Sequence, residues 1–315
     1  MKIDLSSGIS LALLALALSA GTPSVAAPSA NGTVIAKIAY AFPKYESVEG
    51  MDFYAEKSEY DAAVGDPKFT FEKLQTVSDG LSVVTYLYRP SESANRKLPV
   101  IIFSRGSATM GDAAPQLIAF FHRLASQGFV VVAPQYRGSD GGEGKDEIGG
   151  ADLDDVTSAL QLAKSLDYAD TRNVFLYGES RGGMMTYQAV RDGLPVNAAA
   201  VFGAFTDLEI MNQSPYVQKV IPQIWPDYAQ NKDAIIRRRS AKYWPEKLSV
   251  PLLIMNGTAD QQVDPKQPLA LAIQLQELHK DYALILYNNG NHLLTADRLD
   301  RDAQAIAWFR KHLRN

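Results

Sequence analysis

The sequence predicts an α/β fold built on a mostly parallel, doubly wound sheet. Short apolar runs are rich in strand-forming residues and end at Gly, Pro or Asn, a pattern typical of strands buried on both faces. The runs are LPVIIFS, GFVVVAP, NVFLYG, NAAAVFGAF, VPLLIMNG and YALILYNNG. Helical patterns separate these runs, so strands and helices alternate as they do in a parallel sheet.

An antiparallel hairpin is predicted ahead of the parallel strands. From Phe69, apolar and polar residues alternate through FTFEKLQTV and LSVVTYLYRP, with the turn residues SDG between them. We expect this hairpin at an edge of the sheet. The helical patterns that follow it are APQLIAFFHRLASQG, GADLDDVTSALQLAKSL, RGGMMTYQAVRDG, QPLALAIQLQELHK and DRDAQAIAWFRKHLR.

Residues 1–26 are predicted to be a secretory signal peptide. A short start with Lys2 leads into the apolar stretch ISLALLALALSA and then into small residues. Ser24 and Ala26 occupy the two positions before the cleavage site at which a signal peptidase requires small residues. The apolar stretch is shorter than the ~20 residues of a membrane span, although an uncleaved anchor is the alternative. We therefore expect an exported protein, periplasmic or extracellular, without a stable membrane anchor.

The rest of the chain is expected to form an N-terminal extension, 27–68, and one α/β catalytic domain, 69–315. Within the domain, residues 209–244 interrupt the alternation with a segment rich in Pro and aromatic residues, which we interpret as a helical lid. No repeat of 20 to 50 residues occurs, which argues against a β-propeller in this chain.

Composition excludes several classes of function. The sequence contains no Cys, which excludes disulfides, thiolate metal ligands and a cysteine nucleophile. A net charge of -4 argues against binding to nucleic acid, which requires clustered positive charge. The acidic run ADLDDV is expected to complement a helix dipole rather than hold a metal, and no motif implies a cofactor.

The stretch YGESRGGMM contains the pattern GxSxG, centred on Ser180. The apolar run before it predicts a strand and the pattern after it predicts a helix, which is the context a nucleophile elbow requires. Gly178 and Gly182 leave room for the tight turn. Because the helix begins directly after Ser180, the N–H of Arg181 is expected where an oxyanion would develop. We predict that Ser180 is a catalytic nucleophile.

A serine nucleophile needs a base that a carboxylate orients. His292 follows a strand and a flexible turn in ILYNNGN, so we expect it at the carboxyl end of a strand, where such folds build their sites. The other histidines lie on helical patterns, where packing or surface roles are expected. They are His122, His279 and His312.

The acid of the triad is expected between the serine and the histidine in sequence, the order found after this kind of elbow. The loop in LLIMNGTADQQVD offers Asp260 and Asp264. Asp260 follows the strand's end by four residues, whereas Asp264 precedes Pro265 and is expected to cap the next helix. We therefore predict Asp260 as the acid.

These motifs together resemble the catalytic domain of the prolyl oligopeptidase family of serine peptidases. The resemblance covers about residues 69–313 and rests on YRGSDGGEG, GGADLDDV, YGESRGG, PLLIMNGTADQQV and GNH. It implies an α/β-hydrolase fold and hydrolysis of peptide bonds through an acyl-serine intermediate. Position by position, it assigns Ser180, Asp260 and His292 to the triad.

The chain departs from this family at the second oxyanion donor. Relatives often read HGGP or place a tyrosine there, whereas this chain reads FSRGSA. Losing such a donor costs about 10²–10³ in rate, so another group must replace it. The backbone N–H of Arg105 and the hydroxyl of Ser104 are the candidates. Asn256 also stands where relatives commonly have His.

The motifs leave the substrate open. A triad serves esters as well as peptides, so a carboxylesterase is the alternative to a peptidase, and a non-catalytic binding protein on this scaffold is a second alternative. The predicted lid contains Tyr216, Trp225 and Tyr228. We expect at least one of them to line the acyl pocket and favour a hydrophobic or prolyl residue, the alternative being that they only pack the lid onto the domain.

Overall fold

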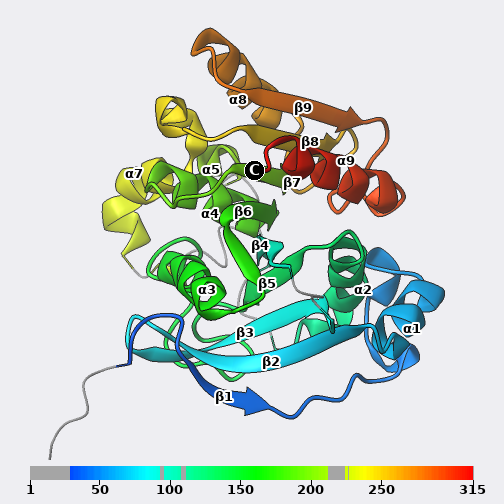
Figure 1. Ribbon diagram of the computed structural model, residues 1–315. Coiled ribbons are helices and arrows are strands. Elements are labelled where there is room, and N and C mark those ends of the chain that lie inside the picture. The colour runs from blue at the N-terminus through cyan, green and yellow to red at the C-terminus, as the bar shows by residue number, and fades with distance from the viewer. Residues whose placement is uncertain (1–28, 93–95, 108–110, 212–223, 226, 315) are drawn as a thin grey trace, which may run out of the picture.

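A computed structural model describes residues 29–92, 96–107, 111–211, 224–225 and 227–314 (Figure 1). The predicted signal peptide and Tyr216 lie outside these residues. In the described part, one nine-stranded sheet has the order β1-β2-β3-β5-β4-β6-β7-β8-β9. The strands are β1 (Val34–Ile38), β2 (Phe69–Ser78), β3 (Leu81–Pro90), β4 (Leu98–Ser104), β5 (Val130–Pro134), β6 (Ala169–Glu179), β7 (Ala198–Phe202), β8 (Leu252–Gly257) and β9 (Tyr282–Tyr287).

The predicted hairpin is β2 and β3, which pair antiparallel over their whole length. β3 is antiparallel to β5, and the pairs from β5 through β4 to β9 are parallel. The expectation that the hairpin forms the sheet edge is wrong, because β1 pairs antiparallel with β2 outside it. β1 is not predicted because its sequence VIAKI does not alternate between apolar and polar residues. Its side chains are mostly exposed, with Ile35 at 49%, and it pairs with β2 through backbone hydrogen bonds.

Helices cover both faces of the sheet. The longer ones are α1 (Lys57–Gly65), α2 (Ala114–Ala125), α3 (Leu153–Ser165), α4 (Arg181–Arg191), α7 (Tyr228–Arg239), α8 (Lys266–Glu277) and α9 (Arg298–Lys311), and α5 (Leu208–Met211) is one turn. Single 3₁₀ turns are η1 (Tyr45–Ser47), η2 (Met51–Phe53), η3 (Ala241–Tyr243) and η4 (Pro245–Lys247). No helix among the described residues is long and apolar enough to cross a bilayer.

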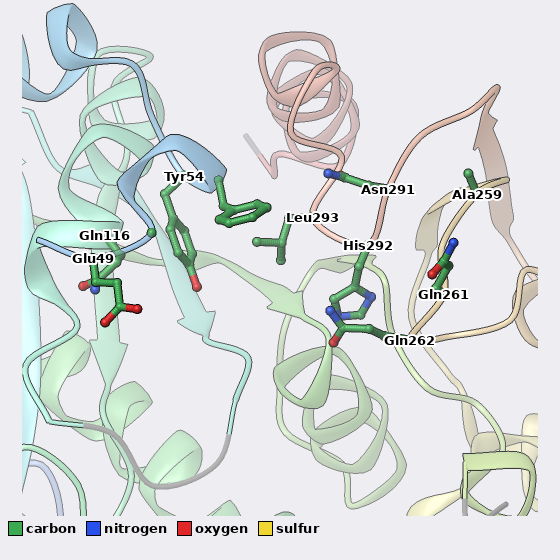
Figure 2. Close-up of a pocket in the computed structure, with 11 residues that line it drawn as sticks. Glu49, Tyr54, Gln116, Ala259, Gln261, Gln262, Asn291, His292 and Leu293 are labelled. Carbon is green, nitrogen blue, oxygen red and sulfur yellow. The ribbon is translucent and has the colours of Figure 1, made fainter. Parts of the chain in front are cut away.

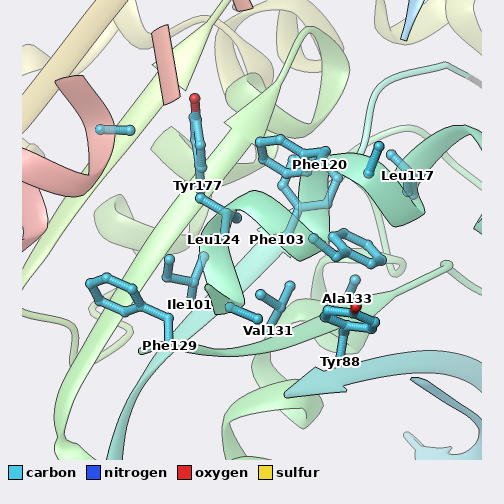
Figure 3. Packing of buried hydrophobic residues seen from close by; sticks show 14 of the residues in the cluster. Tyr88, Ile101, Phe103, Leu117, Phe120, Leu124, Phe129, Val131, Ala133 and Tyr177 are labelled. Carbon is cyan, nitrogen blue, oxygen red and sulfur yellow. The ribbon is translucent and has the colours of Figure 1, made fainter. Parts of the chain in front are cut away.

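Two apolar clusters fill the space between the sheet and these helices. One lies against α1, α2 and α9, and the other against α3, α4 and α8 (Figure 1). Figure 3 shows the first cluster, in which Phe103 of β4 and Phe120 of α2 pack with ring centroids 4.7 Å apart beside Tyr177 of β6. This two-sided burial accounts for the continuous apolar runs of the central strands.

Asp302 of α9 joins three parts of the domain beneath the site. Its buried carboxylate accepts hydrogen bonds from the Nε of Arg123 in α2 at 2.8 Å, the Nε of Arg301 at 2.8 Å and the hydroxyl of Tyr177 at 3.0 Å. Both guanidinium groups therefore have a carboxylate partner where water is scarce, which is the condition for burying a charge.

Candidate active site

Ser180 sits on a sharp turn between β6 and α4. Its φ of 52° and ψ of -118° are strained for a residue with a side chain, and such strain is typical of a nucleophile elbow. The N–H of Ser180 donates to the carbonyl of Phe202 in β7 at 2.9 Å. Its own carbonyl accepts from the N–H of Gly183 at 3.0 Å, which begins the helix.

Glycines make this turn possible. A Cβ at Gly182 would collide with the carbonyl oxygen of Ser104 at the end of β4, and a Cβ at Gly183 would collide with the side chain of Ala204. The helix after the nucleophile can therefore lie directly against neighbouring strands only because these positions lack side chains.

The structure brings the three predicted triad residues together. The hydroxyl of Ser180 donates to Nε2 of His292 at 2.9 Å, and Nδ1–H of His292 donates to Oδ2 of Asp260 at 2.9 Å. All three side chains are buried, with exposed fractions of 8%, 8% and 6%. This is the geometry in which an imidazole can take the hydroxyl proton while a carboxylate holds the ring in one tautomer.

The loop after β8 orients the acid. The other oxygen of Asp260 accepts hydrogen bonds from the N–H groups of Gln262 at 2.8 Å and Val263 at 2.9 Å. Asp264, the rejected candidate, instead accepts from the N–H of Lys266 at the start of α8 at 2.9 Å. Asp260 thus contacts the imidazole and Asp264 lies at the start of α8, where Pro265 is the N-cap residue, and the catalytic role of Asp260 stays a prediction.

The loop after β4 runs beside the nucleophile. A Cβ on Gly106 would lie 3.2 Å from the Cβ of Ser180, so this backbone borders the site. Arg105 turns its guanidinium away, donating to the side chain and carbonyl oxygens of Gln135 at 3.1 and 2.8 Å. Ser104 has no exposed surface, which argues against its hydroxyl as an oxyanion donor.

Arg181, the residue after the nucleophile, ties the elbow to two loops through its side chain. Its guanidinium donates to Asp146 and Asp152 at 2.6 Å and to the carbonyl of Ser107 at 2.9 Å. Burial would raise the pKa of Asp152, but the Arg181 charge and the N–H of Gly149 hold it below its ordinary value. The sequence motif did not indicate this ion pair, because its partners lie 29 or more positions away.

The acidic run lies at the start of α3, with Asp154 and Asp155 in the first turn as expected for the helix dipole, and two of its carboxylates also bind arginines. Asp152 pairs with Arg181, and Asp155 accepts from the Nη2 of Arg137 at 3.0 Å and from the hydroxyl of Ser78 at 2.6 Å. Within the described ranges, no three His, Asp or Glu side chains are grouped in a way that could hold a metal ion.

Glu179 is a site residue that the sequence reading missed. It ends β6 directly before Ser180 and is 8% exposed. Burial raises the pKa of its carboxyl group above the ordinary value, although the charges of Arg301, His292 and Arg105 oppose this rise. The available signal was a charged residue inside an apolar strand, where a side chain is expected to be buried.

A cavity of about 730 Å³ opens beside His292. One wall comes from the N-terminal extension, including Tyr54, and the opposite wall comes from the acid loop, including Gln262 (Figure 2). The complete lining is Glu49, Gly50, Phe53, Tyr54, Gln116, Ala259, Gln261, Gln262, Asn291, His292 and Leu293. The extension, which looked irregular in sequence, thus borders the site.

The predicted lid aromatics that the structure describes make packing contacts, and no contact places them in or out of an acyl pocket. Trp225 is 6% exposed, donates from Nε1 to the carbonyl of Glu147 at 2.6 Å, and lies beneath the guanidinium of Arg239 at 4.4 Å. Tyr228 stacks on it with ring centroids 6.1 Å apart. These contacts are those of packing, and neither residue lines the cavity beside His292.

Replacing Trp225 tests the packing role. Trp225→Ala should lower the free energy of unfolding by about 3 kcal/mol, because it removes a buried indole from a small cluster. Urea unfolding measures the change, and the exposed Ile273→Ala in α8 serves as the control, with an expected effect within about 0.5 kcal/mol. A variant of unchanged stability that discriminates differently between bulky and small acyl groups would instead make Trp225 a pocket residue.

Comparisons with known proteins agree with this architecture. The family model described as "Prolyl oligopeptidase family" matches residues 116–315. The "Uncharacterized peptidase YtmA" of Bacillus subtilis (strain 168) is 27% identical over 239 residues, which are 75% of this chain and 91% of that protein. The acylamino-acid-releasing enzyme of Rattus norvegicus is 27% identical over 254 residues, 72% of this chain but 33% of that protein.

Solved structures share the fold. A puromycin-hydrolyzing peptidase of Mycobacterium tuberculosis superposes with a TM-score of 0.67 and 20% identity, over 79% of this chain and 40% of that one. An acylaminoacyl peptidase of Pyrococcus horikoshii gives a TM-score of 0.62 over 78% of this chain and 42% of that one. The chain therefore spans less than half of these proteins, and the predicted α/β-hydrolase fold is confirmed.

Proposed function

This chain belongs to the prolyl oligopeptidase family of serine peptidases, and from that premise we propose that it cleaves peptide bonds with Ser180, His292 and Asp260. The observation that carries the proposal is the continuous hydrogen-bond relay from the Ser180 hydroxyl through the imidazole to the Asp260 carboxylate, 2.9 Å at each step. A relay of this kind is how a weakly nucleophilic hydroxyl is activated at neutral pH.

The reaction proceeds in two halves. Oγ of Ser180 attacks the peptide carbonyl carbon while Nε2 of His292 takes the hydroxyl proton, and Asp260 stabilises the imidazolium that forms. The C–N bond then breaks, and the leaving amine takes that proton from Nε2. Water then attacks the acyl carbon while Nε2 of His292 takes its proton. The ester bond to Oγ breaks, Nε2 returns that proton to Oγ of Ser180, and the carboxylic acid leaves.

The oxyanion of the tetrahedral intermediate needs donors on the face opposite His292. The N–H of Arg181 is the first of α4 and has no acceptor inside the helix, so it is the primary donor. The second donor is assigned to a backbone N–H of the loop after β4, with Arg105 as the candidate, since Gly106 of that loop lies beside Ser180.

Substitutions in the triad test the proposal. Ser180→Ala and His292→Ala should each lower kcat by about 10⁴–10⁶, and Asp260→Asn by about 10⁴, because the acid orients the base without contacting substrate. Hydrolysis of a peptide library measures complete turnover, and labelling by a fluorophosphonate measures the reactivity of the Ser180 hydroxyl alone. Asp264→Asn is the matched control, with kcat expected within about twofold of the wild type. A Ser180→Ala enzyme that keeps a tenth of its activity would contradict the assignment.

The cavity beside His292 is proposed to bind the leaving-group side of the substrate. Nε2 of His292 delivers its proton to the leaving amine, so that half of the substrate must lie on the histidine side. Phe53 offers an apolar surface there, being 59% exposed on the rim. An aromatic or aliphatic side chain after the cleaved bond would pack against this ring.

Phe53→Ala should lower kcat/KM about 5- to 10-fold for peptides with a bulky residue after the cleaved bond, because one ring contact contributes about 1–1.4 kcal/mol. Steady-state hydrolysis of paired peptides with Phe or Gly at that position measures the effect. Val64→Ala, also an exposed apolar residue, controls for altered surface apolarity. Equal losses of kcat/KM on both peptides would show that the cavity does not recognise the residue after the cleaved bond.

Export is a separate proposal, supported by the signal-peptide pattern of residues 1–26 alone. Expression of the full chain in a bacterial host should give a mature protein that begins at Ala27 and is found outside the cytoplasm. Fractionation followed by N-terminal sequencing measures both properties. A cytoplasmic protein that retains Met1 would contradict export.

A further inference from the structure

Glu179 presents a buried carboxylate without a partner to the space beside the nucleophile. It is 8% exposed, and no hydrogen bond or ion pair joins its side chain to any residue that the structure describes. A Cβ on Gly106 would lie 2.7 Å from Oε1 of Glu179 and 3.2 Å from the Cβ of Ser180. The carboxylate and the nucleophile therefore border the same small space.

A second, smaller cavity lies against this carboxylate. Its volume is about 20 Å³, which holds one group of the size of a water molecule or an ammonium ion. Aromatic side chains form part of its wall, and burial followed by the charge of Glu179 raises the pKa of Tyr54 to about 12. The lining is Phe53, Tyr54, Gln116, Leu117, Phe120, Arg123, Glu179, Phe202, Leu293, Arg298 and Arg301.

The arginines of this cavity wall do not neutralise Glu179. Each guanidinium is engaged by another carboxylate, so three positive charges face three negative charges and Glu179 is the additional negative one. The ion pairs are Arg301 with Asp302 at 2.8 Å, Arg123 with Asp302 at 2.8 Å and with Glu59 at 3.5 Å, and Arg298 with Glu59 at 2.7 Å and with Glu56 at 3.0 Å.

Arg105 is a further cation close to Glu179, and its charge opposes the rise in the pKa of that carboxyl group. Its guanidinium donates to the two oxygens of Gln135, to the hydroxyl of Ser139 at 3.0 Å and to the carbonyl of Gly106 at 2.8 Å. A cation delivered by the substrate therefore meets a carboxylate whose hydrogen-bonding capacity is not used by the described protein.

We propose that Glu179 binds the ammonium group of a substrate with a free amino terminus, so that the enzyme removes single N-terminal residues. The inference rests on the proposed function and names its substrate class. The amino group of an aminoacyl substrate is two bonds from the carbonyl carbon that Ser180 attacks, which places it beside the residue next to the nucleophile. With the ammonium held there, the acyl side of the substrate is limited to one residue.

The free enzyme is destabilised by this arrangement. Because burial raises the pKa of Glu179 in the folded state, ionisation of the carboxyl group disfavours folding as pH rises through that pKa. The isosteric Glu179→Gln should therefore unfold at a higher temperature than the wild type at pH 7, and the difference should vanish below about pH 4. A carboxylate retained for stability would give the opposite sign.

Paired substrates test the assignment. Aminoacyl coumarin amides with small and large side chains are compared with their N-acetyl counterparts, and kcat/KM is measured for the wild type and Glu179→Gln. The wild type should prefer the free amines, and the variant should lose about 10- to 100-fold of that preference, as expected for one hydrogen bond between charged groups. Glu277→Gln, which removes the same charge from the exposed end of α8, should keep the preference.

The pH dependence of the wild type gives an independent measurement. KM for the free-amine substrates should rise above about pH 8, where an α-ammonium loses its proton, whereas KM for the acetylated substrates should not. A preference for acetylated substrates, or equal losses on both series in Glu179→Gln, would overturn the inference and leave a bound water as the occupant of the cavity. A wild type that hydrolyses no substrate and resists fluorophosphonate labelling would overturn the proposed function, and this inference with it.

Discussion

The site depends on how closely the backbone of the elbow approaches its neighbours. Ser180 adopts a positive φ, and the turn that follows lies against the carbonyl of Ser104 with no room for a side chain at Gly182. The strain of this turn, of the order of 1–3 kcal/mol, is offset by the hydrogen bond from the Ser180 N–H to Phe202 and by the ion pairs of Arg181. The nucleophile therefore lies at the end of β6 in a turn that backbone and side-chain contacts hold on both sides.

Parallel strand pairing places the other two triad residues at the same edge of the sheet as Ser180. β6, β7, β8 and β9 are neighbours in order, so the loops that follow β6, β8 and β9 leave the same edge of the sheet. The acid loop and the histidine loop approach so closely that a Cβ at Gly257 would collide with the carbonyl of Gly290. Three residues separated by up to 112 positions are therefore placed within hydrogen-bond distance by strand register and by glycines at the crossings.

Local sequence patterns could predict the sheet, the elbow and the triad candidates, because each depends on neighbours in the chain. Ser180 lies between a strand and a helix pattern, and Asp260 differs from Asp264 by its distance from Pro265. β1 is not predicted, since its residues VIAKI are mostly apolar but neither alternate with polar residues nor form a long run. The packing of Trp225 could not be distinguished from a pocket role, because buried packing and substrate binding both favour aromatic side chains. The proposed catalytic roles stay predictions until the substitutions are made.

Glu179 shows why a stability-based reading of sequence overlooks part of the site. A fold optimised only for stability would place an apolar or neutral residue at the end of β6, because an unpaired buried carboxylate costs free energy. Stable alternatives are readily available to a protein, so a residue that opposes folding persists where another requirement outweighs it. At this position the cost falls on the free enzyme, and a cationic group arriving with the substrate supplies the missing partner. The same burial that makes the carboxylate unfavourable in the empty site strengthens its attraction for an ammonium group, since water screens neither charge there.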